Sequence, residues 1–200
     1  MEYQVKKTNV INPSIDSSEW LQANTGVLNN CIWDGYHLAP QMQFKILRGP
    51  EGISILMHTN ERSLRAVAKT WLDPVFEDSC MEFFFKPDIY DKRYINFEVN
   101  PTGVMHIGIG SDRYDRALIT DDRDMLSIVS DAHEGDWTVK FYIPDEFLLK
   151  YFKNISPVCR GNFYKCGDKT DHIHYASWAP VETAEPDFHV ADFFDKIRFI

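Results

Sequence analysis

The sequence predicts an all-β fold, a β-sandwich of jelly-roll-like topology with one short helix. Three observations predict it: many short segments in which apolar and polar residues alternate, frequent turn signals between them, and a single segment with helical character. Alternation with a period of two is typical of half-buried strands, and many short strands separated by turns are typical of sandwiches. A chain of 200 residues can bury one two-layer core, so we expect a single domain over 1–200.

The expected strands follow one another along most of the chain. Residues 43–48 and 53–59 flank a Gly-Pro-Glu-Gly turn and predict a hairpin, and 93–100 and 104–109 meet at a turn that contains Pro-Thr-Gly and predict a second one. The helix is expected at about 144–152, where proline and acidic residues favour a helix N-terminus. Further strands are expected at 64–71, 80–86, 126–131, 137–143, 161–166, 173–178 and 196–200.

Charge and hydropathy limit the partners. The formal net charge is −9 with no run of Lys and Arg, which disfavours nucleic acid because a phosphate backbone would be repelled. No stretch of about 18 apolar residues occurs, so we expect no membrane span. The N-terminus has no apolar segment of the kind found in signal peptides, so a cytoplasmic location is expected unless a signal has been removed.

The cysteines do not predict a metal site. The chain is not cysteine-dense, so Cys31, Cys80, Cys159 and Cys166 are expected to be free, buried thiols. Cys159 and Cys166 lack the C-x-x-C spacing of zinc sites. We therefore expect no resident cofactor from these residues.

One strand face combines carboxylates and amides. In 80–86, Met81, Phe83 and Phe85 share one face and Glu82 lies on the other. The next strand adds Asn96, Glu98 and Asn100 to a polar face, and Phe76 precedes the first strand in a loop. Carboxylates and amides bind hydroxyls in pairs, while aromatic rings cover the apolar face of a sugar. The alternative interpretation is an ordinary solvated outer face.

Three segments carry a family resemblance. The stretches 74–86 (PVFEDSCMEFFFK), 95–103 (INFEVNPTG) and the C-terminal part from Gly161 through Trp178 to Lys196-Ile197-Arg198-Phe199 resemble family 9 carbohydrate-binding modules. In that family an aromatic residue precedes an Asp-Ser pair and a strand that contains Glu. The resemblance covers most of residues 40–200. It implies a jelly-roll-like sandwich that binds carbohydrate without catalysis, often beside enzymes that degrade xylan or cellulose, and a broad fold shared with DOMON domains.

The resemblance also implies a set of site residues. Phe76 and Phe188, with His189 as an alternative to Phe188, stand where the family clamps a sugar between two tryptophans. Glu82 and Asn100 match hydrogen-bonding positions, Glu98 replaces a basic residue, and Lys165 replaces a glutamine. Trp178 is either a further binding aromatic or a residue at the core edge. Some family members bind calcium, for which this chain offers Asp112, Asp115, Asp121, Asp122 and Asp124.

The sequence also fits three other functions. A sandwich that has lost sugar binding would act as an interaction domain. Met57-His58 and Met105-His106 offer the axial ligands that haem-binding DOMON domains use. Glu82 and Glu98 are also the residue types of a glycosidase pair.

Overall fold

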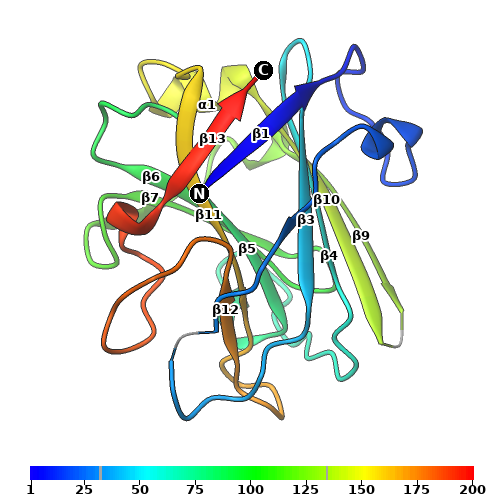
Figure 1. The fold of residues 1–200 in the computed structure, drawn as a ribbon, viewed down its shortest axis with the longest axis vertical. Coiled ribbons are helices and arrows are strands. Elements are labelled where there is room, and N and C mark those ends of the chain that lie inside the picture. Colours follow the sequence, from blue (N-terminus) through cyan, green and yellow to red (C-terminus); the bar gives the residue numbers. More distant parts are fainter. Residues whose placement is uncertain (32, 134) are drawn as a thin grey trace.

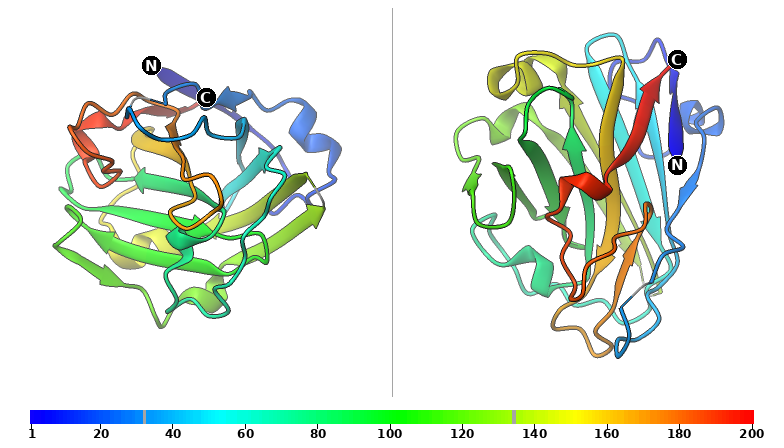
Figure 2. Two further views of the ribbon diagram at one scale, coloured as in Figure 1. Left: turned by 90° about the horizontal axis from the view of Figure 1, so that it is seen from below. Right: turned by 60° about the vertical axis from the view of Figure 1, so that its left-hand side comes forward.

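The all-β sandwich with one helix is confirmed. The computed structural model describes residues 1–31, 33–133 and 135–200. Two curled sheets pack against each other, as Figures 1 and 2 show. The first sheet contains β5 (Cys80–Lys86), β6 (Tyr94–Val99), β7 (Met105–Gly110), β8 (Arg116–Leu118), β11 (Val158–Cys166), β12 (Tyr175–Ser177) and β13 (Asp195–Phe199). The second contains β2 (Gly26–Val27), β3 (Met42–Arg48), β4 (Gly52–Thr59), β9 (Ser127–His133) and β10 (Asp136–Pro144).

Strand β1 (Glu2–Lys7) joins the two sheets. Its first residues pair in parallel with β13, and Lys6 and Lys7 pair in parallel with β3. Figure 1 shows β1 and β13 side by side near both chain ends. The alternation in EYQVKK buries Tyr3 and Val5. Sequence reasoning did not predict this strand, because no turn signal or second apolar run marks it.

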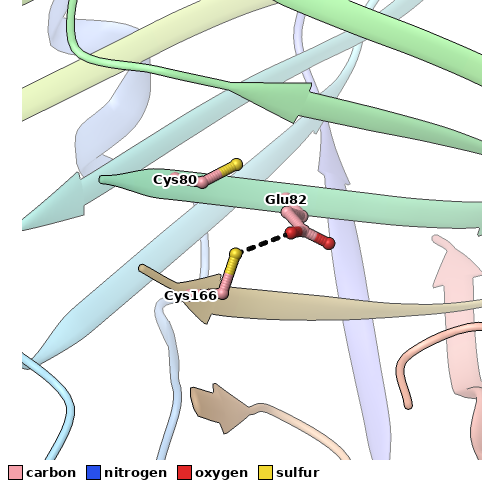
Figure 3. Close-up of side chains that lie close together, drawn as sticks. All are labelled: Cys80, Glu82 and Cys166. Carbon is pink, nitrogen blue, oxygen red and sulfur yellow. Dashed lines mark hydrogen bonds between the residues drawn. The ribbon is translucent and has the colours of Figure 1, made fainter. Parts of the chain in front are cut away.

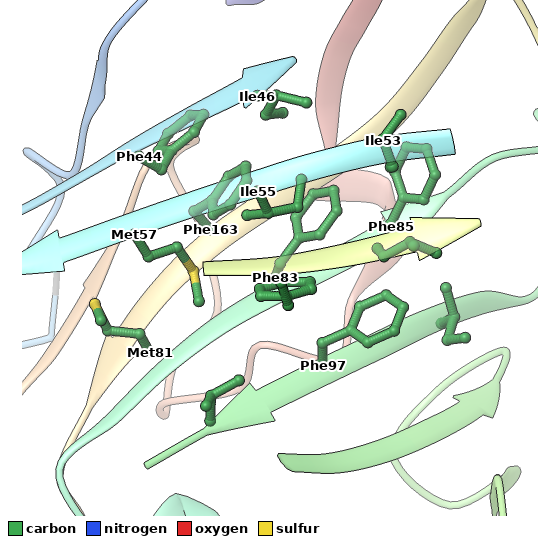
Figure 4. Close-up of a cluster of buried hydrophobic side chains, with 14 of the residues drawn as sticks. Phe44, Ile46, Ile53, Ile55, Met57, Met81, Phe83, Phe85, Phe97 and Phe163 are labelled. Carbon is green, nitrogen blue, oxygen red and sulfur yellow. The ribbon is translucent and has the colours of Figure 1, made fainter. Parts of the chain in front are cut away.

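The core lies between the sheets and is rich in phenylalanine. Met81, Phe83 and Phe85 point into it, as the alternation predicts. The ring of Phe163 stacks on Phe44 of the opposite sheet at 3.6 Å and on Phe83 at 4.4 Å (Figure 4). Stacked rings from both sheets fill this layer and support the first sheet from its inner side.

Helix α1 (Asp145–Tyr151) lies where the sequence predicts it, directly after β10. Its first turn carries Asp145 and Glu146, and its buried residues are Phe147 and Leu148. Among the described residues, no helix has the length and apolar character needed to cross a lipid bilayer.

The prediction of a strand at 64–71 is wrong. Backbone N–H groups of this segment bond to side chains instead of to a neighbouring strand: Asp78 accepts from Val67 and Ala68, each at 2.9 Å, and Ser79 Oγ accepts from Arg65 at 3.0 Å. Carboxylate and hydroxyl acceptors can take the place of a β-ladder in this way. Alternation alone does not reveal such a competitor.

The outer face of the first sheet is covered, not solvated. Glu82, Glu98 and Asn100 are buried there, beside a second apolar cluster that includes Phe84 and Tyr94. Residues 178–194 contribute to this cluster and cover part of the face. Of the four cysteines, Cys80, Cys159 and Cys166 are buried as expected, whereas Cys31 is exposed, so that part of the prediction is wrong.

Candidate functional site

A pocket of about 460 Å³ opens on the outer face of the first sheet. Strands β5, β6 and β11 form its floor, and the 3-10 turn η2 (Val75–Glu77), β8 and the segments around β12 form its walls. It is lined by Tyr36, Phe76, Glu82, Glu98, Arg113, Arg116, Cys166, Asp168, Tyr175, Glu185, Pro186, Phe188 and His189.

Two carboxyl groups lie side by side on the floor. Glu82 and Glu98 are direct cross-strand partners on β5 and β6. Oε1 of Glu98 accepts from Arg116 Nη1 at 3.1 Å and from Asn96 Nδ2 at 2.8 Å. Oε2 of Glu98 is buried and has no hydrogen-bond partner among the described residues. A buried polar atom without a partner is costly, and a ligand donor that reached Glu98 from the pocket would satisfy this oxygen.

Burial controls protonation around the floor. Burial, together with the nearby charge of Glu98, raises the pKa of Glu82 well above its usual range. Burial also lowers the pKa of His189 to about 3, and the Arg116 guanidinium adds to this shift. Both groups are therefore uncharged at neutral pH, and the ion pair between Glu98 and Arg116 is the main charge of the floor.

His189 connects Tyr94 on β6 to Arg116 on β8. Its Nδ1 hydrogen-bonds the hydroxyl of Tyr94 at 2.8 Å, and Arg116 Nη1 lies 3.3 Å from its Nε2. A neutral imidazole satisfies both contacts, since Nε2 then accepts from the guanidinium. These hydrogen bonds run from Tyr94 through His189 and Arg116 to Glu98. They hold the Arg116 and Glu98 side chains in fixed orientations on the floor of the pocket.

Aromatic rings form one side of the pocket. Tyr36 and Phe76 are 40% and 39% exposed, so each offers a ring surface to a ligand. Tyr175 meets Tyr36 edge to face at 4.8 Å. Phe188 is buried and stacks on Tyr164 at 4.1 Å. One face of Phe188 is therefore already covered by protein.

The turn that carries Phe76 is tied to the turn after β11. The carbonyl of Phe76 accepts from the backbone of Asp168 at 3.4 Å, and the carbonyl of Glu77 accepts from Lys169 at 3.1 Å. These bonds position the Phe76 ring at the rim without a strand beneath it. Burial raises the pKa of Asp168, whose side chain also lines the pocket.

Comparison with known proteins assigns the chain to a family. The sequence model described as carbohydrate-binding family 9 matches residues 18–199. The chain belongs to this family. None of the curated proteins with which it was compared matches it.

Solved structures of other proteins have a similar fold. A candidate carbohydrate-binding protein from Bacteroides uniformis ATCC 8492 is 29% identical, with a TM-score of 0.85 over 100% of this chain and 99% of that one. A family 9 module from Caldicellulosiruptor kristjanssonii in complex with cellotriose is 10% identical, with a TM-score of 0.71 over 100% and 93% of the two chains. The same comparison with its glucose complex gives 10%, 0.70, 100% and 96%. At 10% identity the two complexes show the fold alone.

The structure brings four predicted site residues to this pocket. Phe76, Glu82, Glu98 and Phe188 all line it, and so does His189, the alternative to Phe188. Phe76 lies on the turn before β5, and Phe188 comes from the segment after β12.

Three predicted residues lie elsewhere. Lys165 pairs in register with Met81, on the core face of the sheet, so it points away from the pocket. Trp178 packs in the core against Tyr3 and Phe44. Asn100 follows β6 in a tight turn, where its Oδ1 accepts from the backbone of Thr102 at 3.1 Å and of Val104 at 3.0 Å. The structure therefore gives these three side chains packing and turn contacts.

Sequence reasoning missed several lining residues. Tyr36, Arg113, Arg116, Asp168, Tyr175 and Glu185 lie in loops or at strand ends outside the motifs. Arg116 lies on β8, the short strand that pairs with β7 and carries its side chain to Glu98. The sequence pattern of β8 spans only Arg116–Leu118, too short for alternation to identify.

The other candidate ligand groups do not line this pocket. Asp112 accepts from the backbone of Tyr114 and Asp115, each at 2.8 Å, and Asp122 pairs with Lys150. A calcium ion at the acidic residues stays a prediction.

Met57 and Met105 face the core while His58 and His106 lie on the opposite faces of their strands, as alternation predicts.

Acid is expected to destabilise the domain through His189. Its pKa is about 3 in the folded chain, below its ordinary value of 6.5, so the unfolded chain binds a proton that the folded chain excludes. The free energy of unfolding therefore falls as the pH drops below about 6.5. In His189→Asn we expect the loss between pH 7 and pH 5 to be smaller by about 2 kcal/mol.

Urea unfolding at both pH values measures this difference. His133→Asn is the matched control, because the His133 side chain is 76% exposed. An unaltered pH dependence in His189→Asn, equal to that of the control, would rule out His189 as the responsible group.

Gly108 leaves the space that Arg116 occupies. A Cβ at Gly108 would lie 2.9 Å from Arg116 Cδ and 2.7 Å from Asn96 Oδ1. Such contacts are too short, so Gly108→Val is expected to displace the guanidinium from Glu98. We expect ligand affinity to fall about tenfold, that is by roughly 1.4 kcal/mol, with the fold retained by circular dichroism. Wild-type affinity in a folded Gly108→Val protein would contradict the proposal that Gly108 leaves the space needed by Arg116.

Proposed function

We propose that this chain binds a carbohydrate in the pocket above β5 and β6 and does not transform it. The observation that carries the proposal is the buried Oε2 of Glu98, which has no partner among the described residues although Arg116 and Asn96 hold the carboxylate in place. A sugar hydroxyl is the kind of donor that satisfies such an oxygen. Membership of carbohydrate-binding family 9 supports this assignment.

The walls suit a sugar ring for a second reason. Phe76 and Tyr36 offer exposed ring faces, and aromatic faces cover the C–H side of a pyranose. Asp168 and Arg113 supply further polar groups at the rim. The volume of about 460 Å³ lies toward the lower end of ligand pockets. We infer that it accepts one or two sugar rings at the end of a chain.

Glucose and cello-oligosaccharides are the first ligands to test. The structures of the Caldicellulosiruptor kristjanssonii module contain glucose and cellotriose. We propose that this chain binds the end of a β-glucan or of another plant cell-wall polysaccharide. An enzyme that degrades the same polysaccharide is the partner that we expect. The aromatic clamp is proposed to consist of Phe76 and Tyr36, because Phe188 is covered on one face by Tyr164.

Catalysis is the weaker candidate. A glycosidase needs two carboxyl groups that flank the scissile bond. Glu82 and Glu98 instead rise from neighbouring strands of the same floor, and both would approach a sugar from one side. Glu98 is also ion-paired with Arg116, which suits an acceptor of hydrogen bonds better than a proton donor.

A glycan panel followed by calorimetry tests the proposal. We expect saturable binding of at least one mono- or oligosaccharide at one site per chain, with no product released from the ligand. Absence of binding across neutral, acidic and amino sugars would overturn the proposal. Release of product that is lost in Glu82→Gln would replace it by the glycosidase function.

Phe76→Ala is expected to weaken sugar binding about 10- to 100-fold, because a stacking ring of this kind contributes roughly 1–3 kcal/mol. The turn is held by backbone bonds to Asp168 and Lys169, so the fold should persist. Tyr90→Ala is the matched control, since Tyr90 is a highly exposed aromatic residue that does not line the pocket. Equal affinities of the two variants would remove Phe76 from the site.

A further inference from the structure

Two thiols and a carboxyl group converge at the edge of the pocket floor. Cys80 and Cys166 are direct cross-strand partners on β5 and β11, and Glu82 lies two residues after Cys80 on the same face. One ligand atom from each of the three side chains lies within 4.8 Å of the others, and all three residues are buried. Figure 3 shows Cys166 directed toward Glu82 across the two strands, with Cys80 beside Glu82 on β5.

The contacts within this cluster leave few competing partners. Cys166 Sγ donates to Glu82 Oε1 at 2.9 Å and lies 3.6 Å from the carbonyl of Phe76. Cys80 Sγ lies 3.9 Å from the carbonyl of Met81. Neither a lysine nor an arginine forms a hydrogen bond or ion pair with these three side chains among the described residues. A metal ion that binds here would replace the hydrogen bond between the Cys166 thiol and the Glu82 carboxyl group.

Burial disfavours the charged forms of these three groups, so an ion that binds here must displace their protons. Burial raises the pKa of the Cys80 thiol to about 12. The thiol of Cys80 and burial together raise the pKa of Cys166. Without an ion, three neutral groups therefore face one another in a low-dielectric setting, and an arriving divalent ion would supply the charge that stabilises their deprotonated forms.

We propose that Cys80, Glu82 and Cys166 form a binding site for a thiophilic divalent ion, with Zn²⁺ as the reference ion and a fourth coordination position open to the pocket. Two thiolates and one carboxylate are ligands that Zn²⁺ accepts in tetrahedral sites. Calcium is disfavoured because it requires six to eight oxygen ligands. Cys166 and Glu82 line the pocket, which supplies the entry path and leaves the fourth position accessible.

Charge and protons balance in this reaction. The ion binds to both sulfur atoms and one carboxylate oxygen, and each thiol releases its proton to solvent, as does Glu82 where it is protonated. No oxidant or reductant is needed. The site does not depend on sugar binding, and it was not predicted from the sequence because the pairing of Cys80 with Cys166 becomes visible only in the strand register.

Cobalt and zinc titrations of the reduced protein test the proposal. We expect one ion per chain and, with Co²⁺, a sulfur-to-metal charge-transfer band. Cys80→Ala and Cys166→Ala should lose the band and at least 100-fold in affinity, while Glu82→Gln should lose roughly 10- to 100-fold. Cys159→Ala is the matched control, since that buried thiol contacts the carbonyls of Pro87 and Ser156 instead.

A second measurement avoids variants. Anomalous scattering from crystals soaked in Zn²⁺ is expected to place the ion between the sulfur atoms of Cys80 and Cys166. No charge-transfer band, a band that persists in Cys80→Ala, or an ion located elsewhere would overturn the proposal. So would a reduced protein that binds no ion but readily forms a Cys80–Cys166 disulfide on mild oxidation.

Discussion

Lys165→Met is expected to lower the free energy of unfolding by about 3–5 kcal/mol, the cost of breaking a buried ion pair from one side. Lys165 is completely buried, with its Nζ 2.9 Å from Glu61 Oε2 and 3.0 Å from His174 Nε2. Removing the ammonium would leave the Glu61 carboxylate buried without its counter-charge. Denaturant unfolding of the variant and the wild type measures the difference.

Two further variants make this result specific. Lys165→Met combined with Glu61→Gln should regain part of the lost stability, because no unpaired charge then remains. Lys169→Met is the exposed control and should change stability by less than about 1 kcal/mol, since the Lys169 side chain is 59% exposed in its pair with Glu77. A stable Lys165→Met protein with weakened sugar binding would instead support the role implied by the family resemblance.

Glu98→Ala is expected to weaken sugar affinity at least 30-fold, equivalent to roughly 2 kcal/mol or more. The substitution removes the unpartnered Oε2 and also leaves the Arg116 guanidinium without its carboxylate. Both effects act on the same floor, so the loss should exceed that caused by removing the exposed Arg113 side chain at the rim. Calorimetric titration with the best ligand of the glycan panel measures it.

Arg113→Ala is the matched control for Glu98→Ala. Arg113 also lines the pocket, but its side chain is 47% exposed and pairs with Asp187 at the rim. We expect only a few-fold change in affinity, because exposed ion pairs contribute little. Circular dichroism at the titration temperature shows whether Glu98→Ala remains folded. Affinity equal to wild type in a folded Glu98→Ala protein would exclude Glu98 from the site.

Most of the fold could be predicted from alternation and turn signals. The pattern of β5 assigns Met81, Phe83 and Phe85 to the core, and the structure places them there. Strands without a strong pattern of their own were missed, because β1 is held by parallel pairing with β13 and β3. The segment 64–71 alternates but is not a strand, since Asp78 and Ser79 take its backbone hydrogen bonds.

Alternation could predict the site only where residues share a strand or its preceding turn, whereas Phe188 followed from the family resemblance. Glu82 and Glu98 follow from the faces of β5 and β6, and Phe76 follows from its place before β5. Lys165 was predicted to contact the sugar from the family correspondence, which does not reveal its register with Met81 on the core face. Arg116 and Tyr36 come from distant segments that only the folded chain brings to the pocket.

Mapping of a bound sugar onto the chain tests the central claim most directly. Backbone amide shifts would be recorded during titration with the tightest ligand of the glycan panel. We predict that the largest changes cluster at η2, at Glu82 and Glu98 on the floor, and around Phe188. Changes confined to the second sheet, or no changes at any ligand concentration, would contradict a carbohydrate site in this pocket.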